Sequence, residues 1–213
     1  MKKLFMLFSV MIALLLVGCN TVKPNQQPEK GDFKFCSVEW GSDWETLRES
    51  DAFRNAVILK ENGNRKTVEP EDVTYLGIPV EEAGLVFDSN GVGDIDGLTS
   101  VAIRYEEENE EALLSKLEEL YGKRENTYKD KNGYTNPVDP AGWVSNETVE
   151  SVLTEEEKEY YVSMFPKNYG QTRIDALLRS PLVTINFDDE NNIVVFNGND
   201  AATVSYIQRE LKK

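Results

Sequence analysis

An uncharged, apolar run near the start of the chain limits most strongly what the chain can fold into. The run covers residues 4–17 and follows the positive charges of Lys2 and Lys3. As an α-helix it would rise about 21 Å, whereas the hydrocarbon core of a bilayer is about 30 Å thick. The run therefore predicts the core of a cleaved signal peptide, not a permanent membrane span. The residues after it form the mature protein.

The residues that end this run carry a specific pattern. Leu16, Val17, Gly18 and Cys19 resemble the lipobox of bacterial lipoproteins, with a small residue just before the cysteine. A Gram-positive setting is expected. The resemblance implies a signal peptide of residues 1–18, a diacylglycerol on Cys19 and a lipid anchor in the cell membrane at its extracytoplasmic face. Two acyl chains give durable anchoring, whereas one binds only marginally. The alternative is an ordinary secretory signal with a chance cysteine.

The stretch after Cys19 differs in composition from the rest of the chain. Residues 20–31 are polar and include Pro24 and Pro28, so residues 19–31 are expected to form the lipidated N-terminus and a flexible tether. Residues 32–213 are long enough to bury a sizeable core and are predicted to form one globular domain. Two repeats, residues 32–123 and 124–213, are the alternative.

Charge and residue types exclude several classes of function. The formal net charge is −15, and it becomes −17 once Lys2 and Lys3 are removed. Phosphate backbones repel such a chain, so no nucleic-acid partner is expected. The sequence has no histidine, which excludes Ser-His and Cys-His nucleophile pairs and the usual zinc site. We therefore predict a protein that is not an enzyme, with no catalytic, cofactor-binding or metal residues. Cys36 is expected to be a buried strand residue.

Alternating and apolar segments bounded by turn residues predict strands. The fold class expected is α+β, an antiparallel sheet with helices packed on one face. Residues 33–40 are expected to form a strand or an extended lead-in. Further strands are expected at residues 56–60, 73–76, 84–87 and 98–105, and in a hairpin of residues 182–187 and 193–196. Residues 123–141, with Gly133, Pro137 and Pro140, are expected to form a surface loop.

Helical spacing and capping residues predict three helices. The first begins near Ser42 or Asp43 and includes Trp44 and Leu47. The second covers residues 106–121, with Asn109 as a cap, Gly122 as its end and Glu107, Glu111, Glu118 and Glu119 on its solvated side. Residues 146–165 form the third, in two pieces with a second cap at Thr154. Residues 172–178 are expected to add a turn or strand, and residues 201–211 suit either a helix or a closing strand.

Two short stretches resemble a known group of small lipoproteins with folds like the β-lactamase inhibitory protein. They are the Trp40-Gly41-Ser42-x-Trp44 opening of the first helix and the Leu114-x-x-Leu117-x-x-Leu120-Tyr121-Gly122-Lys123 end of the second. The resemblance implies helix-plus-sheet repeats and a binding or assembly role, not catalysis. It covers about a tenth of the chain and brings no inhibitory loop with it.

The turn between the strands at 84–87 and 98–105 contains residue types that metal and phosphate sites use. Asp88, Asn90, Asp94 and Asp96 could offer oxygens to Ca²⁺, but Val92 stands at a ligand position and Thr99 replaces the expected glutamate. A Gly-permitted turn is the favoured interpretation. Gly91-x-Gly93 has no following lysine and opens no helix, which argues against a phosphate loop.

Acidic and aromatic residues elsewhere have simple structural interpretations. Asp188, Asp189 and Glu190 are adjacent and are expected to form a hairpin turn, since glycosidase chemistry needs two carboxylates that face each other across a cleft. The aromatic side chains could line a ligand site or fill the core, and the sequence leaves both open. They are Trp40, Trp44, Trp143, Tyr160, Tyr161 and Tyr169.

These observations predict a surface-anchored lipoprotein that is a protein-binding or envelope-assembly module with an unidentified protein partner. The alternative is a lipoprotein that binds a small ligand or a cation. An exposed apolar patch would favour the first and an aromatic pocket the second.

Overall fold

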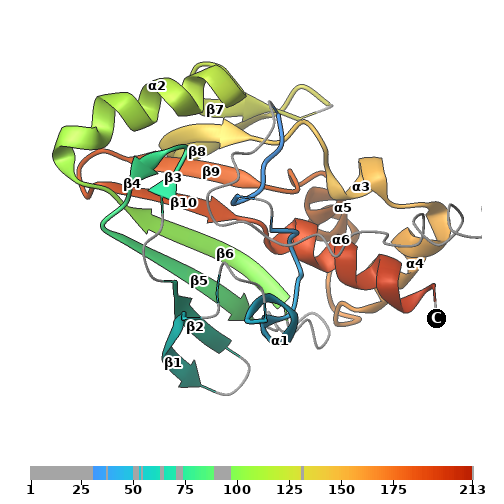
Figure 1. The fold of residues 1–213 in the computed structure, drawn as a ribbon. Helices are drawn as coiled ribbons and strands as arrows, with labels where there is room; N and C mark the ends of the chain where they lie inside the picture. Colours follow the sequence, from blue (N-terminus) through green and yellow to red (C-terminus); the bar gives the residue numbers. More distant parts are fainter. Residues whose placement is uncertain are drawn as a thin grey trace, which may run out of the picture.

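The strands of the computed structural model form one large antiparallel sheet (Figure 1). The structure describes residues 31–36, 38–49, 53, 55–62, 65–70, 74–88, 97–130 and 132–212. Within these residues the sheet has eight strands in the order β1-β2-β5-β6-β10-β9-β8-β7. Their bounds are β1 Val57–Asn62, β2 Arg65–Glu69, β5 Glu82–Asp88, β6 Gly97–Arg104, β7 Glu125–Lys129, β8 Thr135–Val144, β9 Thr184–Asp188 and β10 Ile193–Asn197.

A two-stranded sheet and the helices complete the fold. β3 (Thr74–Tyr75) pairs with β4 (Ile78–Pro79). The helices are α1 Trp44–Leu47, the 3-10 turn η1 Glu107–Asn109, α2 Glu110–Tyr121, α3 Val149–Val152, α4 Glu155–Ser163, α5 Gln171–Leu178 and α6 Asn199–Glu210. In Figure 1, α2 lies at the β7–β8 end of the sheet and α3 to α6 gather beyond one end of its strands.

One face of the sheet is buried. Alternate residues of the central strands point into a single apolar cluster, among them Leu85, Val101, Ile103 and Phe196. The helices α1, α2 and α6 contribute Trp44, Leu47, Leu113, Leu117 and Ala202 to the same cluster. This arrangement confirms the α+β prediction of an antiparallel sheet with helices on one face. Strands from residues 32–123 and from 124–213 share this sheet, and their division into repeats stays a prediction.

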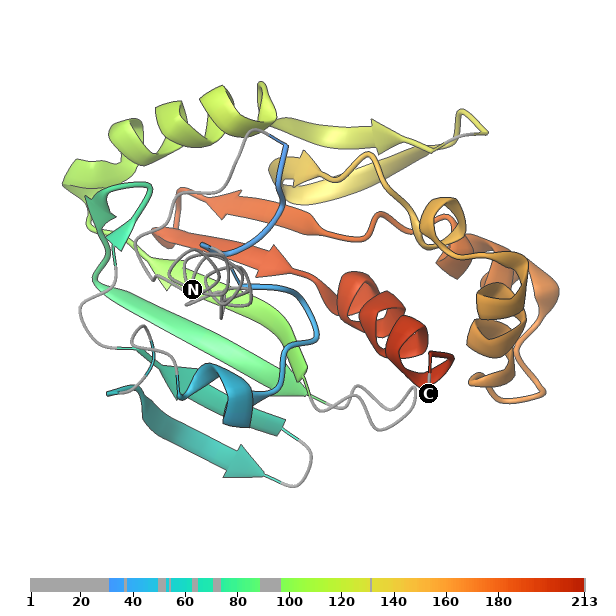
Figure 2. The same cartoon turned by 45° about the vertical axis from the view of Figure 1, so that its right-hand side comes forward.

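The segment before α1, for which the sequence predicts a strand or an extended lead-in, forms no regular strand in the described residues. Residues 31–36 and 38–42 form an irregular path across the buried face (blue in Figure 2), with one isolated bridge between Phe35 and Val38. Cys36 has a positive φ of 55°, which bends the chain. The reason is packing. Phe35, Val38 and Trp40 are all buried, whereas a straight strand would place Phe35 on the side opposite to Val38 and Trp40. The chain therefore bends over the core.

Residues 123–141 were wrongly expected to form a surface loop, because two strands, β7 and β8, occupy most of them. β7 is polar and mostly exposed, and the first six residues of β8 are mostly exposed, so neither segment shows the apolar alternation that marks a half-buried strand. Residues 135–137 of β8 pair with β7 and residues 142–144 pair with β9, while Gly142 also lies opposite Glu125 of β7. Pro140 lies where the register of β7 and β8 shifts, and proline is tolerated at such irregularities.

The C-terminal third confirms most of the predicted elements and corrects one. Helices α3 and α4 are the two expected pieces, and Thr154 caps α4 with a capping box to Glu157. Residues 171–178 form helix α5 and not a turn or strand, because Leu177 and Leu178 pack against a second apolar cluster with α3, α4 and α6, and Ile174 is buried. The open alternative at residues 201–211 resolves as α6, which begins after Gly198.

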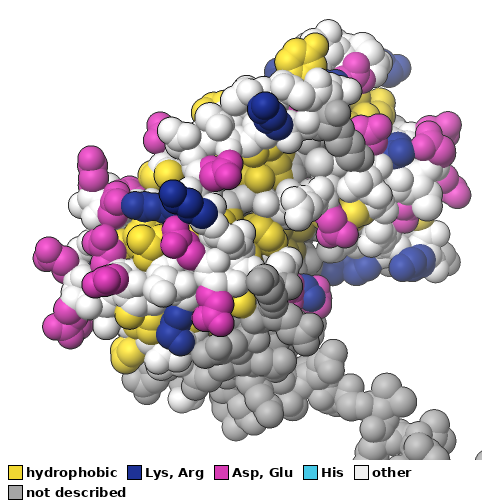
Figure 3. All heavy atoms as spheres, turned by 90° about the horizontal axis from the view of Figure 1, so that it is seen from above, with side chains coloured by type: hydrophobic (Ala, Val, Ile, Leu, Met, Phe, Trp, Pro, Cys, Tyr) yellow, Lys and Arg dark blue, Asp and Glu magenta, His cyan; other side chains and the backbone are white. Residues whose placement is uncertain are grey.

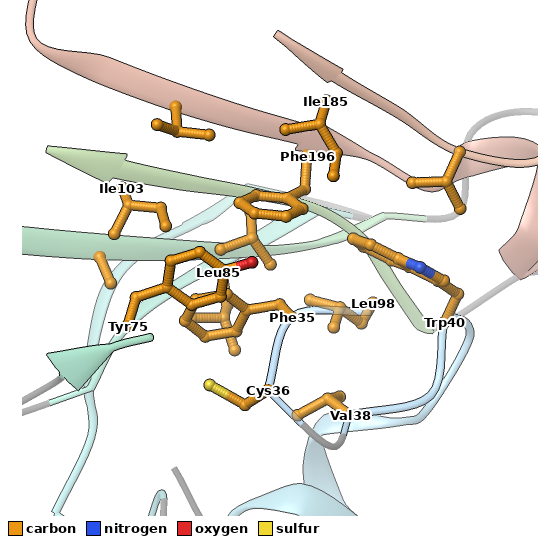
Figure 4. Packing of buried hydrophobic residues seen from close by; sticks show 14 of the residues in the cluster. Phe35, Cys36, Val38, Trp40, Tyr75, Leu85, Leu98, Ile103, Ile185 and Phe196 are labelled. Carbon is orange, nitrogen blue, oxygen red and sulfur yellow. The ribbon is translucent and has the colours of Figure 1, made fainter. Parts of the chain in front are cut away.

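Two tyrosine hydroxyls at the edge of the core differ in how they are satisfied. The Tyr121 hydroxyl donates to the carbonyl oxygen of Asp32 at 3.0 Å. Tyr75 is fully buried, and its hydroxyl, which lies beside that of Tyr121, has no well-aligned hydrogen-bond partner. Figure 4 shows this oxygen pointing into the packed cluster near Phe35 and Phe196. Burial, together with Tyr121, Cys36 and Asp32, raises the pKa of Tyr75 well above its usual value.

Removing these two hydroxyls is expected to have opposite effects. Tyr75→Phe should leave the free energy of unfolding unchanged or raise it by about 1 kcal/mol, because an unsatisfied buried hydroxyl is removed. Tyr121→Phe should lower it by about 1 kcal/mol, because a hydrogen bond is lost. Urea denaturation of both variants beside the parent measures this. A loss in Tyr75→Phe as large as in Tyr121→Phe would contradict the assignment.

Candidate functional site

A groove of about 740 Å³ lies where the first described residues, the end of α2 and α6 meet. Its lining combines apolar residues that are buried or half-buried, Trp40, Leu182 and Val204, with carboxylates that are mostly exposed. We call the apolar set the floor and the carboxylates the rim. The full lining is Gly31, Asp32, Phe33, Lys34, Glu39, Trp40, Glu118, Glu119, Leu120, Tyr121, Gly122, Val144, Ser145, Asn146, Glu147, Leu182, Val183, Ala201, Val204 and Ser205. A volume of this size is typical of sites for small molecules.

Hydrogen bonds hold the walls of the groove together. The backbone N–H of Gly31 donates to the Leu120 carbonyl at 3.3 Å. The Trp40 indole Nε1 donates to the Phe33 carbonyl at 2.8 Å, which fixes the ring in the floor. That ring lies directly on Gly198, where a Cβ would come within 2.2 Å of it. Only glycine therefore fits between β10 and α6 at this point.

Five carboxylates and one ammonium line the groove. Lys34 Nζ lies 2.6 Å from Glu39 Oε1 and 3.8 Å from Asp32 Oδ2. Within the described residues, Glu118, Glu119 and Glu147 form no salt bridge. Figure 3 shows acidic side chains spread over the molecule seen from above, with apolar side chains between them. The groove therefore has a net negative charge above an apolar floor.

A second surface lies at the β1 edge of the large sheet. β1 pairs with β2 on one side only. Its first three residues are large, apolar and about half exposed: Val57 50%, Ile58 44% and Leu59 51%. We call these three residues the β1 patch. It is a contiguous exposed apolar surface on a strand whose outer backbone groups have no sheet neighbour among the described strands.

A smaller hollow surrounds Arg124 near the turn between β9 and β10. Arg124 Nη2 lies 3.1 Å from Asp189 Oδ2, and its guanidinium stands 5.3 Å from the Phe187 ring centroid. Hydrogen bonding to Arg124 holds the pKa of Asp189 below its usual value. Asp188 instead accepts from the backbone and side chain of Asn191. The acidic run is therefore a hairpin turn, as predicted.

The structure places some of the residues that the sequence singled out. Cys36 is buried, and burial raises the pKa of its thiol to about 12. Trp44, Trp143 and Tyr161 belong to the apolar clusters, whereas Trp40 also lines the groove. Cys19 and the turn at residues 89–96, with Asn90, Gly91, Gly93, Asp94 and Asp96, lie outside the described residues.

The chain finds no match among family models, curated proteins or solved structures. In the part that the structure describes, no helix is long and apolar enough to span a membrane. Nor do three or more acidic or cysteine side chains there come close enough together to hold a metal ion.

Sequence reasoning missed both surfaces, although each leaves a signal. Residues 57–59 were predicted to belong to a strand, but three consecutive apolar residues on an edge strand cannot all face a core. The sequence predicts that Glu118 and Glu119 lie on the solvated side of the helix. They stand in the last turn of α2, where no basic residue accompanies them. Carboxylates at that end oppose the helix dipole.

Glu118 and Glu119 are expected to destabilise the folded chain, because their charges oppose the dipole of α2. Glu118→Gln with Glu119→Gln should raise the free energy of unfolding by roughly 0.5 to 1 kcal/mol at low ionic strength. The matched pair Glu110→Gln with Glu111→Gln, in the first turn of the same helix, should lower it by a similar amount. Urea denaturation of both double variants measures this. If the first pair lowers stability, these carboxylates stabilise the fold.

Asp200, in the first turn of α6, is half-buried, and burial raises its pKa to about 6. Its charge also contributes to the raised pKa of Tyr161. Because the folded pKa lies above the unfolded value, the protonated form is favoured by folding. The contribution of protonated Asp200 to stability is therefore fully present below about pH 4 and falls as the pH rises through 6.

Asp200→Asn should therefore stabilise the chain in a pH-dependent manner. At pH 7 the variant is expected to unfold with about 2 kcal/mol more free energy than the parent, and near pH 4 the difference should vanish. Urea denaturation at the two pH values gives both numbers. A difference that is the same at pH 4 and pH 7 would show that ionisation of Asp200 is not its cause.

Proposed function

We propose that this chain is a bacterial lipoprotein, anchored through Cys19 at the extracytoplasmic face of the cell membrane, that binds a protein partner through the edge strand β1. It performs no catalysis in this role. The anchor rests on the apolar run at residues 4–17 and the Leu16-Val17-Gly18-Cys19 pattern. The binding role rests on one observation, the β1 patch.

The two edges of the sheet support this assignment by their contrast. At the opposite edge, β7 carries Glu125, Asn126, Thr127, Tyr128 and Lys129, a polar sequence that discourages another strand from pairing. β1 has no charged residue in its first three positions, since Lys60 and Glu61 come later, although its pairing with β2 is irregular between Ile58 and Lys60. An edge that is apolar and unprotected in a chain of net charge −15 is typical of an interaction surface.

The partner that fits is an extended polypeptide segment that adds to the sheet beside β1. The outer backbone groups of an edge strand offer hydrogen bonds that a lipid surface cannot return, whereas another strand can. Apolar side chains on that segment would cover the exposed side chains of the β1 patch. Backbone pairing supplies affinity in this mode, and the apolar contacts supply specificity.

Site-specific photo-cross-linking in intact cells tests the proposal. A photoreactive phenylalanine analogue at Leu59 is expected to give one protein adduct of defined mass, which Ile58→Lys should abolish by placing a charge in the apolar contact. Cys19→Ala should release the chain from the membrane and reduce the adduct.

The control places the same analogue at Thr127 on β7, with Tyr128→Lys as the matched charge variant. Adducts that are equal from the two edges, or none from Leu59, would rule out β1 as the binding strand. An adduct of twice the chain's mass would identify the partner as a second copy. A lipid adduct would replace the protein partner with the membrane surface.

A further inference from the structure

The acidic groove has features that strand addition to β1 does not use. None of its lining residues belongs to β1, so any function of the groove is separate from the proposed one. Its carboxylates come from three distant parts of the chain: Asp32 and Glu39 before α1, Glu118 and Glu119 at the end of α2, and Glu147 before α3. The fold alone brings them to one place.

The groove already holds one ammonium group. Lys34 contacts both Asp32 and Glu39, so two of the five carboxylates share its single positive charge. The remaining three, Glu118, Glu119 and Glu147, have no cationic side chain within salt-bridge distance among the described residues. The α2 carbonyl groups at the same end add partial negative charge. A second positive charge would therefore be attracted to this part of the groove.

A bare metal ion does not match the groove. Metal ions such as Ca²⁺ need six to eight oxygens converging on one point, and no such group of carboxylates exists in the described residues. The groove instead offers the Trp40 ring, Leu182 and Val204 below the acidic rim. A ligand that fills it needs an apolar body as well as a positive charge.

We propose that the groove binds a small organic cation, an amine or guanidinium joined to a hydrocarbon or aromatic body. The cationic end lies at the rim formed by Glu118, Glu119 and Glu147. The apolar body lies on the floor formed by Trp40, Leu182 and Val204. Neutral molecules of the same shape bind more weakly because they leave the rim carboxylates without a counter-charge. Lys34 sets the affinity by competing for Asp32 and Glu39.

Isothermal titration calorimetry with 2-phenylethylamine as the probe tests this, using the full chain in nanodiscs of zwitterionic lipid and empty nanodiscs as the blank. Saturable one-to-one binding is expected, and 2-phenylethanol, which has the same body without the charge, should bind at least about tenfold more weakly. Glu118→Gln with Glu119→Gln should weaken the amine by about tenfold.

Two controls separate the groove from general charge effects. Glu110→Gln with Glu111→Gln removes the same charge from the same helix outside the groove, and should leave binding unchanged. Lys34→Gln removes the ammonium group beside Asp32 and Glu39, and should tighten binding by about threefold or more. No saturable heat, equal binding of the alcohol, or equal losses in the two glutamate pairs would overturn the proposal. None of these outcomes bears on cross-linking at Leu59, so the two proposals fail separately.

Discussion

Antiparallel pairing of β6 with β10 is the interaction on which the rest of the structure depends. Val101 lies opposite Phe196 and Ile103 opposite Val194, and all four side chains are fully buried. This pair joins the strands before residue 105 to those after residue 125 in a single sheet. Because some ninety residues separate the paired strands, the contact closes a long loop at a substantial entropic cost. The large apolar cluster on one face of the sheet offsets that cost.

The same pair determines where the groove lies. β10 ends at Asn197 and leads through Gly198 into α6, while Gly41 donates its N–H to the Leu98 carbonyl of β6 at 2.9 Å. The irregular segment before α1 is thus held over the end of both central strands, with Trp40 on Gly198. The wall from α2 joins it through Leu120 and Tyr121. The groove is therefore a product of non-local packing, because its carboxylates come from segments that are far apart in the sequence.

The sequence predicted those parts of the fold that local chemistry determines. The Thr154 cap, the end of α2 at Gly122 and the β9–β10 hairpin all follow from nearby residues and were confirmed. It failed where tertiary context decides. Residues 33–40 alternate like a strand but bend over the core, and β7 and β8 are strands because they pair with each other and β8 pairs with β9. The three consecutive apolar residues at 57–59 indicate that not all of them face a core, but which strand lies at the sheet edge depends on tertiary pairing.

The position of β10 also affects how the core closes. The central strand of the sheet is the last one in the sequence, and α6, which covers its end, is the last helix. While the final twenty or so residues are missing, β6 and β9 each lack the strand that joins them, and the core stays open to water. Among the described strands, β10 alone joins the two halves of the sheet, with β6 on one side and β9 on the other. A change that displaces β10 would therefore open the core on both of its sides at once.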